Sequence, residues 1–145
     1  MLKRLFLASV VSGLSLLAGA VHAAAADDAR DHFQAIAAGD VDAVMRAYAE
    51  GAQLQWVGGP LDGSYSGGDA IRGVWAKFAG SQGPLKLQVG AIEESMNPKG
   101  STVSANVLFE GKARVPVRYV LTFREGRIVN EVWQVDPKLS VAQTH

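Results

Sequence analysis

The sequence predicts an α+β fold, in which helices come first along the chain and antiparallel strands follow. Up to residue 80, apolar side chains recur mainly at the three- and four-residue spacing of a helix face. From Leu85 onward they alternate with a period of two, as in strands with one buried face. Because both kinds of element must bury their apolar faces, we expect the helices to cover the concave face of a curved sheet and to leave room for a pocket.

The first residues have the features of a secretory signal peptide. Lys3 and Arg4 precede an uncharged apolar stretch, residues 5–20, and the small side chains of a cleavage site follow in residues 21–23. The stretch is shorter than the roughly 20 apolar residues that a membrane-spanning helix needs. We therefore expect residues 1–23 to be removed, which leaves one periplasmic or secreted domain, residues 24–145, without a stable membrane anchor.

Charge and composition argue against several classes of partner. The chain has 14 basic and 14 acidic residues, and two of the basic ones lie in the leader, so no excess of positive charge favours nucleic acid or anionic lipid. It contains no cysteine, which excludes disulfides and thiolate ligands. After cleavage only His32 and His145 remain as histidines, so we expect no metal and no cofactor.

Three helices are expected in the first part of the mature chain, each with an apolar face. Asp40 and Asp69 have side chains suited to cap the second and third helices at their N-termini. Glycines follow all three and are typical helix stops. The expected helices are residues 27–38, 41–50 and 70–79, ending at Gly39, Gly51 and Gly80.

Strands account for most of the remaining chain. The expected strands are residues 52–57, 85–96, 101–111, 114–123 and 127–136. A tight turn at Glu125 and Gly126 joins the last two. The glycine-rich segment 58–69 matches neither a Walker loop nor a GxGxxG motif, so we interpret it as a loop in which Asp62 forms a turn.

Three stretches together resemble the nuclear transport factor 2-like superfamily in its SnoaL-like form. They are AAGDVDAVMRAYAEGAQL, GGDAIRGVWAKF and FREGRIVNEVWQVD, in that order and spacing. The resemblance covers essentially all of the mature chain. It implies a cystatin-like cone, with three N-terminal helices packed in a strongly curved, mainly antiparallel sheet. It also implies a homodimer formed through the outer face of the sheet.

Within that superfamily, residues 33–58 are especially similar to ketosteroid isomerase, but this sequence has other residues at the positions of that enzyme's catalytic residues. The position of its aspartate base is occupied by Trp56, which accepts no proton. His32 stands where the isomerase has a tyrosine donor, and Tyr119 where it has a protonated aspartate. Because that chemistry needs a carboxylate base, the isomerase activity is rejected.

A different set of polar residues is expected inside the cone. Alternation puts Glu131 and Trp133 on one face of the last strand, and the resemblance turns that face inward, together with the face of the preceding strand that carries Tyr119. The first helix contributes His32. The predicted catalytic residues are Glu131, His32 and Tyr119, with a carboxylate or imidazole as base and a phenol as hydrogen-bond donor.

Aromatic side chains form the predicted ligand-binding set. They are Trp56, Trp75, Trp133, Tyr48 and Phe78. As a group around an open cone they would give a small apolar molecule a large contact area.

Each of the polar candidates also has a purely structural interpretation. His32 could be a helix residue bonded to backbone. Glu131 could pair with Arg114 or Arg118, or lie in a dimer interface. Tyr119 could be a core ring with a satisfied hydroxyl group.

Three functions follow from these readings. The first is an exported module that binds a small, largely apolar molecule in its cone pocket. The second is an enzyme of the isomerase, dehydratase or hydrolase type that uses Glu131 or His32 as base. The third is a dimeric protein-interaction module whose interior is only a core.

Overall fold

The computed structural model describes residues 24–141, and the expected leader, residues 1–23, lies outside them. Three helices and six strands follow one another along this part of the chain. The helices are α1 (Ala25–Ala38), α2 (Val41–Arg46) and α3 (Gly68–Gln82). The strands are β1 (Tyr48–Val57), β2 (Gly63–Ser66), β3 (Lys86–Asn97), β4 (Gly100–Glu110), β5 (Arg114–Arg124) and β6 (Arg127–Val135).

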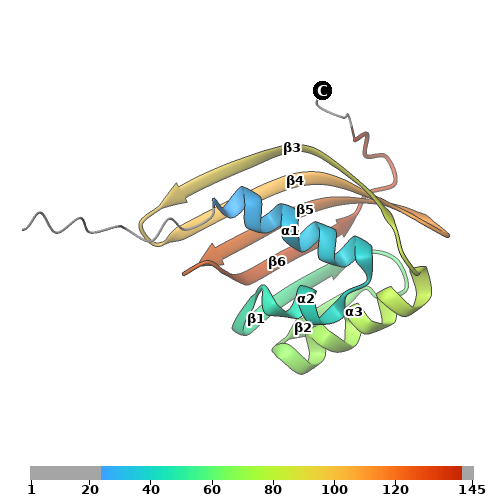
Figure 1. Ribbon diagram of the computed structural model, residues 1–145, viewed down its shortest axis with the longest axis horizontal. Coiled ribbons are helices and arrows are strands. Elements are labelled where there is room, and N and C mark those ends of the chain that lie inside the picture. The colour runs from blue at the N-terminus through green and yellow to red at the C-terminus, as the bar shows by residue number, and fades with distance from the viewer. Residues whose placement is uncertain (1–23, 142–145) are drawn as a thin grey trace, which may run out of the picture.

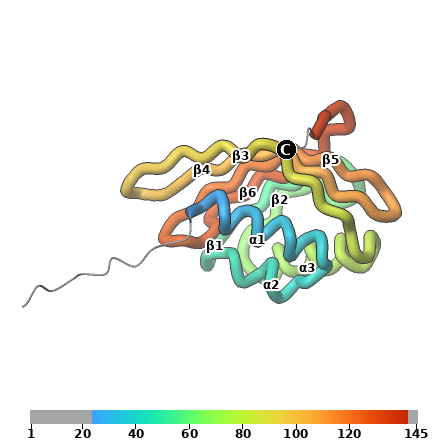
Figure 2. The backbone as a smooth tube through the Cα atoms, turned by 45° about the horizontal axis from the view of Figure 1, so that its top comes forward, coloured from blue at the N-terminus to red at the C-terminus, as the bar shows by residue number. Residues whose placement is uncertain are grey.

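The strands form one curved sheet in the order β2-β1-β6-β5-β4-β3 (Figure 1). All neighbouring strands are antiparallel except β1 and β6, which are parallel. The three helices lie on one side of the sheet, and the sheet bends around them (Figure 2). This arrangement confirms the predicted α+β cone.

The core lies between the helices and the concave face of the sheet. Alternation along β5 turns Val117, Tyr119, Leu121 and Phe123 inward, and all four are buried. α1 adds Phe33, which is fully buried. The helix-facing side of the sheet is therefore covered by the alternate side chains of β5, including Tyr119, as the two-residue alternation predicted.

The second helix is shorter than the sequence predicts. α2 ends at Arg46, and Tyr48 begins β1, where it pairs with Ile128 of β6. The backbone N–H of Ile128 also donates to the carbonyl of Ala47 (2.9 Å). Tyr48 fits a helical stripe and a two-residue alternation equally well, so the pairing with a distant strand decides its conformation.

The third helix is longer than predicted at both ends. Gly67 precedes it with φ of +83°, and Asp69 lies in the first turn instead of at the cap. The helix continues past Gly80 and ends at Gly83, whose φ is +67°. Nothing lies within 4 Å of a Cβ placed at Gly80, and a glycine inside a helix costs only about 1 kcal/mol, so the helix continues through it.

Other local predictions are confirmed. Gly39 ends α1 in the left-handed conformation, and the Asp40 side chain accepts a hydrogen bond from the Ala43 N–H (3.1 Å). Glu125 and Gly126 both have positive φ, as a tight turn between antiparallel strands requires. In residues 24–141, no helix has the length and apolar character needed to cross a membrane.

Candidate functional site

The interior of the cone contains a buried polar cluster centred on Glu131. Its carboxylate accepts hydrogen bonds from the hydroxyl groups of Tyr48 (2.5 Å) and Tyr119. The Nε2 atom of His32 lies 3.4 and 3.3 Å from the two carboxylate oxygens. We call these four residues the Glu131 cluster.

Each member of the Glu131 cluster comes from a different element. β6 is paired on both sides, and Glu131 stands opposite Leu54 of β1 and Leu121 of β5. Tyr119 stands two residues before Leu121, so its side chain shares the inner face. The first residue of β1 supplies Tyr48, and the buried face of α1 supplies His32.

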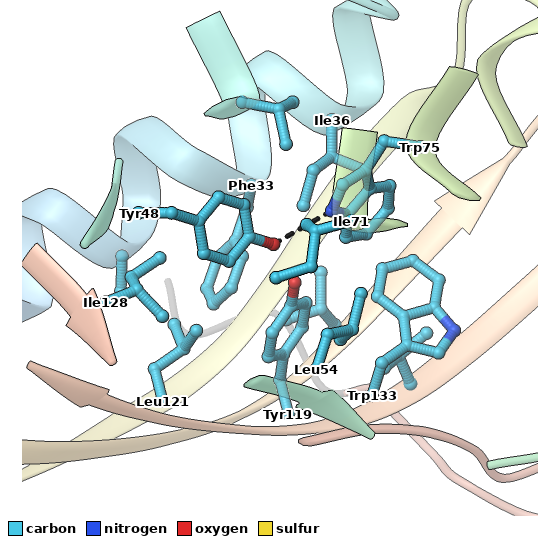
Figure 3. Packing of buried hydrophobic residues seen from close by; sticks show 14 of the residues in the cluster. Phe33, Ile36, Tyr48, Leu54, Ile71, Trp75, Tyr119, Leu121, Ile128 and Trp133 are labelled. Atoms are coloured by element: carbon cyan, nitrogen blue, oxygen red, sulfur yellow. Dashed lines mark hydrogen bonds between the residues drawn. The ribbon is translucent and has the colours of Figure 1, made fainter. Parts of the chain in front are cut away.

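Two polar groups extend or border the cluster. The indole N–H of Trp75 on α3 donates to the hydroxyl of Tyr48 (2.8 Å), which therefore both donates and accepts (Figure 3). Figure 3 also shows the indole nitrogen of Trp133 directed away from the two tyrosine hydroxyl groups. That nitrogen and the Nδ1 atom of His32 are buried without a hydrogen-bond partner among the described residues.

Burial also changes the titration of the two tyrosines. It raises the pKa of Tyr48 and of Tyr119 well above 10, and the nearby charge of Glu131 raises both further. Both phenols therefore stay protonated across the physiological range. They are held as hydrogen-bond donors to the carboxylate.

The Glu131 cluster is closed to solvent. The side chains of His32 and Glu131 are both 0% exposed. The carboxylate contacts His32 and two tyrosines, so the alternative in which it pairs with Arg114 or Arg118 is wrong. The cluster has the groups for proton transfer, but a substrate reaches them only if the surrounding side chains move.

A layer of aromatic rings lies beside the cluster. Trp56 stacks on Trp133 with ring centroids 4.6 Å apart, and Trp133 stacks on Phe109 at 5.1 Å. Trp75 and Phe78 meet these rings edge-on or tilted. Trp133 also meets Tyr119 in a T-shaped contact with ring centroids 5.4 Å apart, so the layer adjoins the Glu131 cluster directly.

A mostly apolar hollow of about 500 Å³ opens on this aromatic layer. It lies between the C-terminal half of α3, the loop after β1, the start of β5 and the end of β6. Its lining residues are Trp56, Gly58, Gly59, Pro60, Leu61, Lys77, Phe78, Ser81, Gln82, Ala113, Arg114, Val115 and Val135. We call this space the end hollow.

The loop that forms one wall of the end hollow is held in shape by its own hydrogen bonds. The Asp62 carboxylate accepts from the backbone N–H of Gly58 (2.7 Å), which confirms the turn-forming role expected for this residue. Gly58 and Gly59 have φ of +99° and +74°, values that favour glycine. The Tyr65 hydroxyl donates to the carbonyl of Leu61 (2.7 Å) and so braces the same wall.

No metal centre is indicated in the described part of the chain. Residues 24–141 contain no group of three or more histidine, aspartate or glutamate side chains that could hold an ion. The Glu131 cluster has only one carboxylate and one imidazole, and the carboxylate already accepts hydrogen bonds from two tyrosine hydroxyl groups.

Comparison with known proteins identifies the family of this fold. The family model described as the SnoaL-like domain matches residues 29–131. The chain belongs to the SnoaL-like family. This match includes most of α1 and the aromatic residues of α3, and it ends at Glu131. The predicted membership of the nuclear transport factor 2-like superfamily is confirmed.

Solved structures share the fold of this SnoaL-like domain at low sequence identity. A putative aromatic ring hydroxylase from Novosphingobium aromaticivorans has a TM-score of 0.68 and 18% identity, over 82% of this chain and 91% of that one. An NTF2-like protein of unknown function from Pseudomonas putida KT2440 has a TM-score of 0.66 and 14% identity, over 83% and 92%. A protein of unknown function with a cystatin-like fold from Nostoc punctiforme has the same TM-score and identity, over 79% and 90%.

These likenesses show the fold of the SnoaL-like domain and no more, because every identity quoted is below one in five. No curated protein matches the chain in sequence. The function must therefore be argued from the site itself.

The SnoaL-like domain divides the predicted site residues among three places. Glu131, His32 and Tyr119 meet in one cluster, and Tyr48 joins them as a second donor to the carboxylate. The aromatic residues Trp75 and Trp133 lie inside the core, 2% and 0% exposed. Of the predicted ligand-binding residues, Trp56 and Phe78 line the end hollow.

Sequence reasoning missed most of the wall of the end hollow. Pro60 and Leu61 belong to the segment interpreted as an ordinary loop, and Lys77 was not singled out on its helix. The one available signal was composition, since Pro60 and Leu61 are apolar residues in an otherwise polar glycine-rich loop. Such residues need a surface to pack on, and the rim of an apolar hollow provides one.

Proposed function

We propose that this SnoaL-like domain binds a small, largely apolar molecule in the end hollow. The observation that carries the proposal is the hollow itself, whose volume of about 500 Å³ lies within the range of small-molecule sites. Apolar residues make most of its lining, which includes Trp56 and Phe78. A few polar groups at the rim complete the composition typical of such sites.

The aromatic floor of the end hollow is rigid before any ligand arrives. Trp56 is 4% exposed and contacts the rings of Trp75, Phe78 and Trp133. Its side chain is therefore fixed by packing on several sides. A ligand that packs against the small exposed part of this floor loses little free energy in ordering the protein, which favours affinity.

A thermal-shift screen of the mature chain, residues 24–145, tests the proposal. The library would contain steroid-like, terpenoid, aromatic and short acyl compounds. A compound present at 100 times its dissociation constant should add about 2.7 kcal/mol to the free energy of unfolding. A flat response across all four classes would refute binding of such molecules.

Two matched variants locate the binding site. Val115→Phe enlarges a half-buried side chain that lines the end hollow, so it should abolish the shift. Val120→Phe makes the same change on the opposite face of β5 and should leave the shift intact. If both variants responded like the unmodified protein, the ligand would bind elsewhere.

A second candidate function is catalysis at the Glu131 cluster. The observation that favours it is the convergence of a carboxylate, an imidazole and two phenol donors on one point, next to the floor of the end hollow. In this reading Glu131 or His32 acts as base and Tyr119 donates a hydrogen bond to a developing oxyanion. The aromatic layer would have to part for substrate to enter.

Product analysis separates the two functions. Each compound that binds should be incubated with the protein and with Glu131→Gln, then recovered and examined by mass spectrometry. Recovery of unchanged compound supports a carrier. Conversion by the native protein but not by Glu131→Gln, with binding kept, supports the enzyme.

We further propose that the protein is exported and acts in the periplasm or outside the cell. Support comes from the apolar stretch and cleavage motif at the start of the sequence. Cell fractionation followed by N-terminal mass analysis tests this. A product that begins between Ala24 and Asp27 in the exported fraction is expected, and an uncleaved chain in the cytoplasm would contradict it.

A further inference from the structure

We infer that the molecule bound in the end hollow is an organic acid, with an apolar body inside the hollow and a carboxylate at its rim. This inference rests on the proposed function, because it names the chemical class of the ligand at that same site. It is drawn from the charges around the rim.

Two cations and no acidic residue line the end hollow. Lys77 lies on the C-terminal half of α3, and Arg114 is the first residue of β5. Both side chains are exposed, so their charged ends meet water while their apolar stems contribute to the wall. The rim is therefore electropositive above an apolar floor.

Neither cation forms an ion pair within the described residues, although Glu110 of β4 stands opposite Arg114 in the sheet. The ion pairs within residues 24–141 involve Arg30, Arg72 and His32, and neither Lys77 nor Arg114 belongs to one. The hydrogen bonds that lysine and arginine side chains donate within the described residues come from Arg30, Arg72, Arg124 and Arg127. Both remain available to a bound anion.

The acidic residues nearest in sequence to the rim are held in other interactions. Asp62 accepts from the backbone N–H of Gly58, and Asp136 accepts from that of Lys138 (3.1 Å). The C-terminal end of α3 also carries about half a negative charge, which acts over its last turn only. The carboxylates of Asp62, Asp136 and Glu110 keep their negative charges, but none of them lines the end hollow. The charged side chains that a ligand meets at the rim are therefore those of Lys77 and Arg114.

These features favour a ligand that has an apolar body and a negatively charged end. An apolar ring or chain on Trp56 and Phe78 leaves only the rim for its polar end. There a carboxylate gains attraction to two cations, and a guanidinium can bind both of its oxygens. An ammonium group at the same place would be repelled.

Calorimetric titration with three matched compounds tests the inference on the mature chain. The probes are 2-naphthoate, the neutral 2-naphthylmethanol and the cationic 2-naphthylmethylamine. We expect the acid to bind about tenfold more tightly than the alcohol, and the amine more weakly than either. Raising the salt concentration should weaken only the acid, because screening acts on exposed charges.

Charge-removing variants assign the effect to the rim. The double variant Lys77→Gln with Arg114→Gln should lower affinity for the acid to that of the alcohol, and leave the alcohol within about twofold. Arg118→Gln is the matched control, since Arg118 is exposed on the same strand outside the end hollow. It should change none of the three affinities.

The outcomes separate this inference from the proposal beneath it. If the alcohol binds as tightly as the acid, or if the double variant still binds the acid more tightly than the alcohol, the inference of a carboxylate ligand is refuted, while the proposal of an apolar binding site stands. If the amine binds best, the charge argument is also refuted. If none of the three binds and the broader screen is flat, the proposed function fails with it.

Discussion

Replacement of Glu131 by leucine removes the group on which three other buried polar side chains converge. In the folded protein its carboxylate accepts from the hydroxyl groups of Tyr48 and Tyr119 and lies beside Nε2 of His32. Leucine fills a similar volume and accepts no hydrogen bond. The variant therefore tests the polar contacts more than the packing.

The size of the effect follows from counting the groups that lose a partner. Each buried donor left unsatisfied costs about 1–3 kcal/mol, and breaking a buried charged set by removing one member costs about 3–5 kcal/mol. Release of the carboxylate from its own burial offsets part of this sum. We expect Glu131→Leu to lower the free energy of unfolding by about 3–5 kcal/mol, a large share of the 5–15 kcal/mol typical of a domain.

Glu131→Gln should be milder. The amide keeps one oxygen acceptor, and a tyrosine hydroxyl can turn to accept from its NH₂ group. We expect a loss of about 1–2 kcal/mol. Glu93→Leu, at an exposed position of β3, is the control and should stay within about 0.5 kcal/mol of the native value.

Urea unfolding, followed by tryptophan fluorescence, measures these differences. All three tryptophans are buried, so their emission reports the loss of the core. A double-mutant cycle with Tyr119→Phe gives the decisive number. In the native background Tyr119→Phe should cost about 1 kcal/mol, whereas beside Glu131→Leu it should be neutral or stabilising, because it then removes an unpartnered hydroxyl group.

Additive costs in that cycle would show that Tyr119 and Glu131 do not depend on one another, and would refute this account of the Glu131 cluster. So would a Glu131→Leu variant as stable as the Glu93→Leu control. Equal losses for Glu131→Leu and Glu131→Gln would show that the amide does not replace the carboxylate as an acceptor, because glutamine has the same shape as glutamate.

Three further predictions concern pH, backbone and assembly. Because the pKa values of Tyr48 and Tyr119 are raised in the folded protein, the unfolded chain loses these two protons first, near pH 10. The free energy of unfolding is therefore unaffected below pH 10 and falls above it, by about 1.4 kcal/mol per pH unit for each tyrosine. Urea titrations at pH 9 to 11 should show this slope, and Tyr119→Phe should halve it. Gly100→Ala should destabilise the protein by about 1–3 kcal/mol, because the added Cβ would lie 2.3 Å from a backbone carbonyl oxygen. Gly80→Ala, in open space on α3, should stabilise it by about 0.5–1 kcal/mol. Thermal melts of the two variants and the native protein measure the differences. We propose a homodimer through the outer face of the sheet, so light scattering should give twice the chain mass and Val132→Glu should halve it; a monomeric native protein would contradict this.

The sequence alone predicted the kinds of element and the direction of most side chains. A two-residue alternation puts Glu131 and Trp133 on one face of β6 and Tyr119 on one face of β5, and the resemblance implied that these faces point inward. All three side chains are buried. Glycines at positive φ mark chain reversals, and Gly39 and Gly126 do so here. These features depend on local sterics and on which residues avoid water, so they can be read from the chain directly.

Only the tertiary structure decided which of these side chains meet. Tyr48 became a strand residue and a donor to Glu131 because β1 pairs with β6, about 80 residues later in the chain. The end hollow is bounded by segments of α3, β1, β5 and β6 that share no sequence pattern. Periodicity records which way a side chain points from its own backbone, but it carries no information on the distance between elements, and that distance determines both the closed carboxylate cluster and the open apolar hollow.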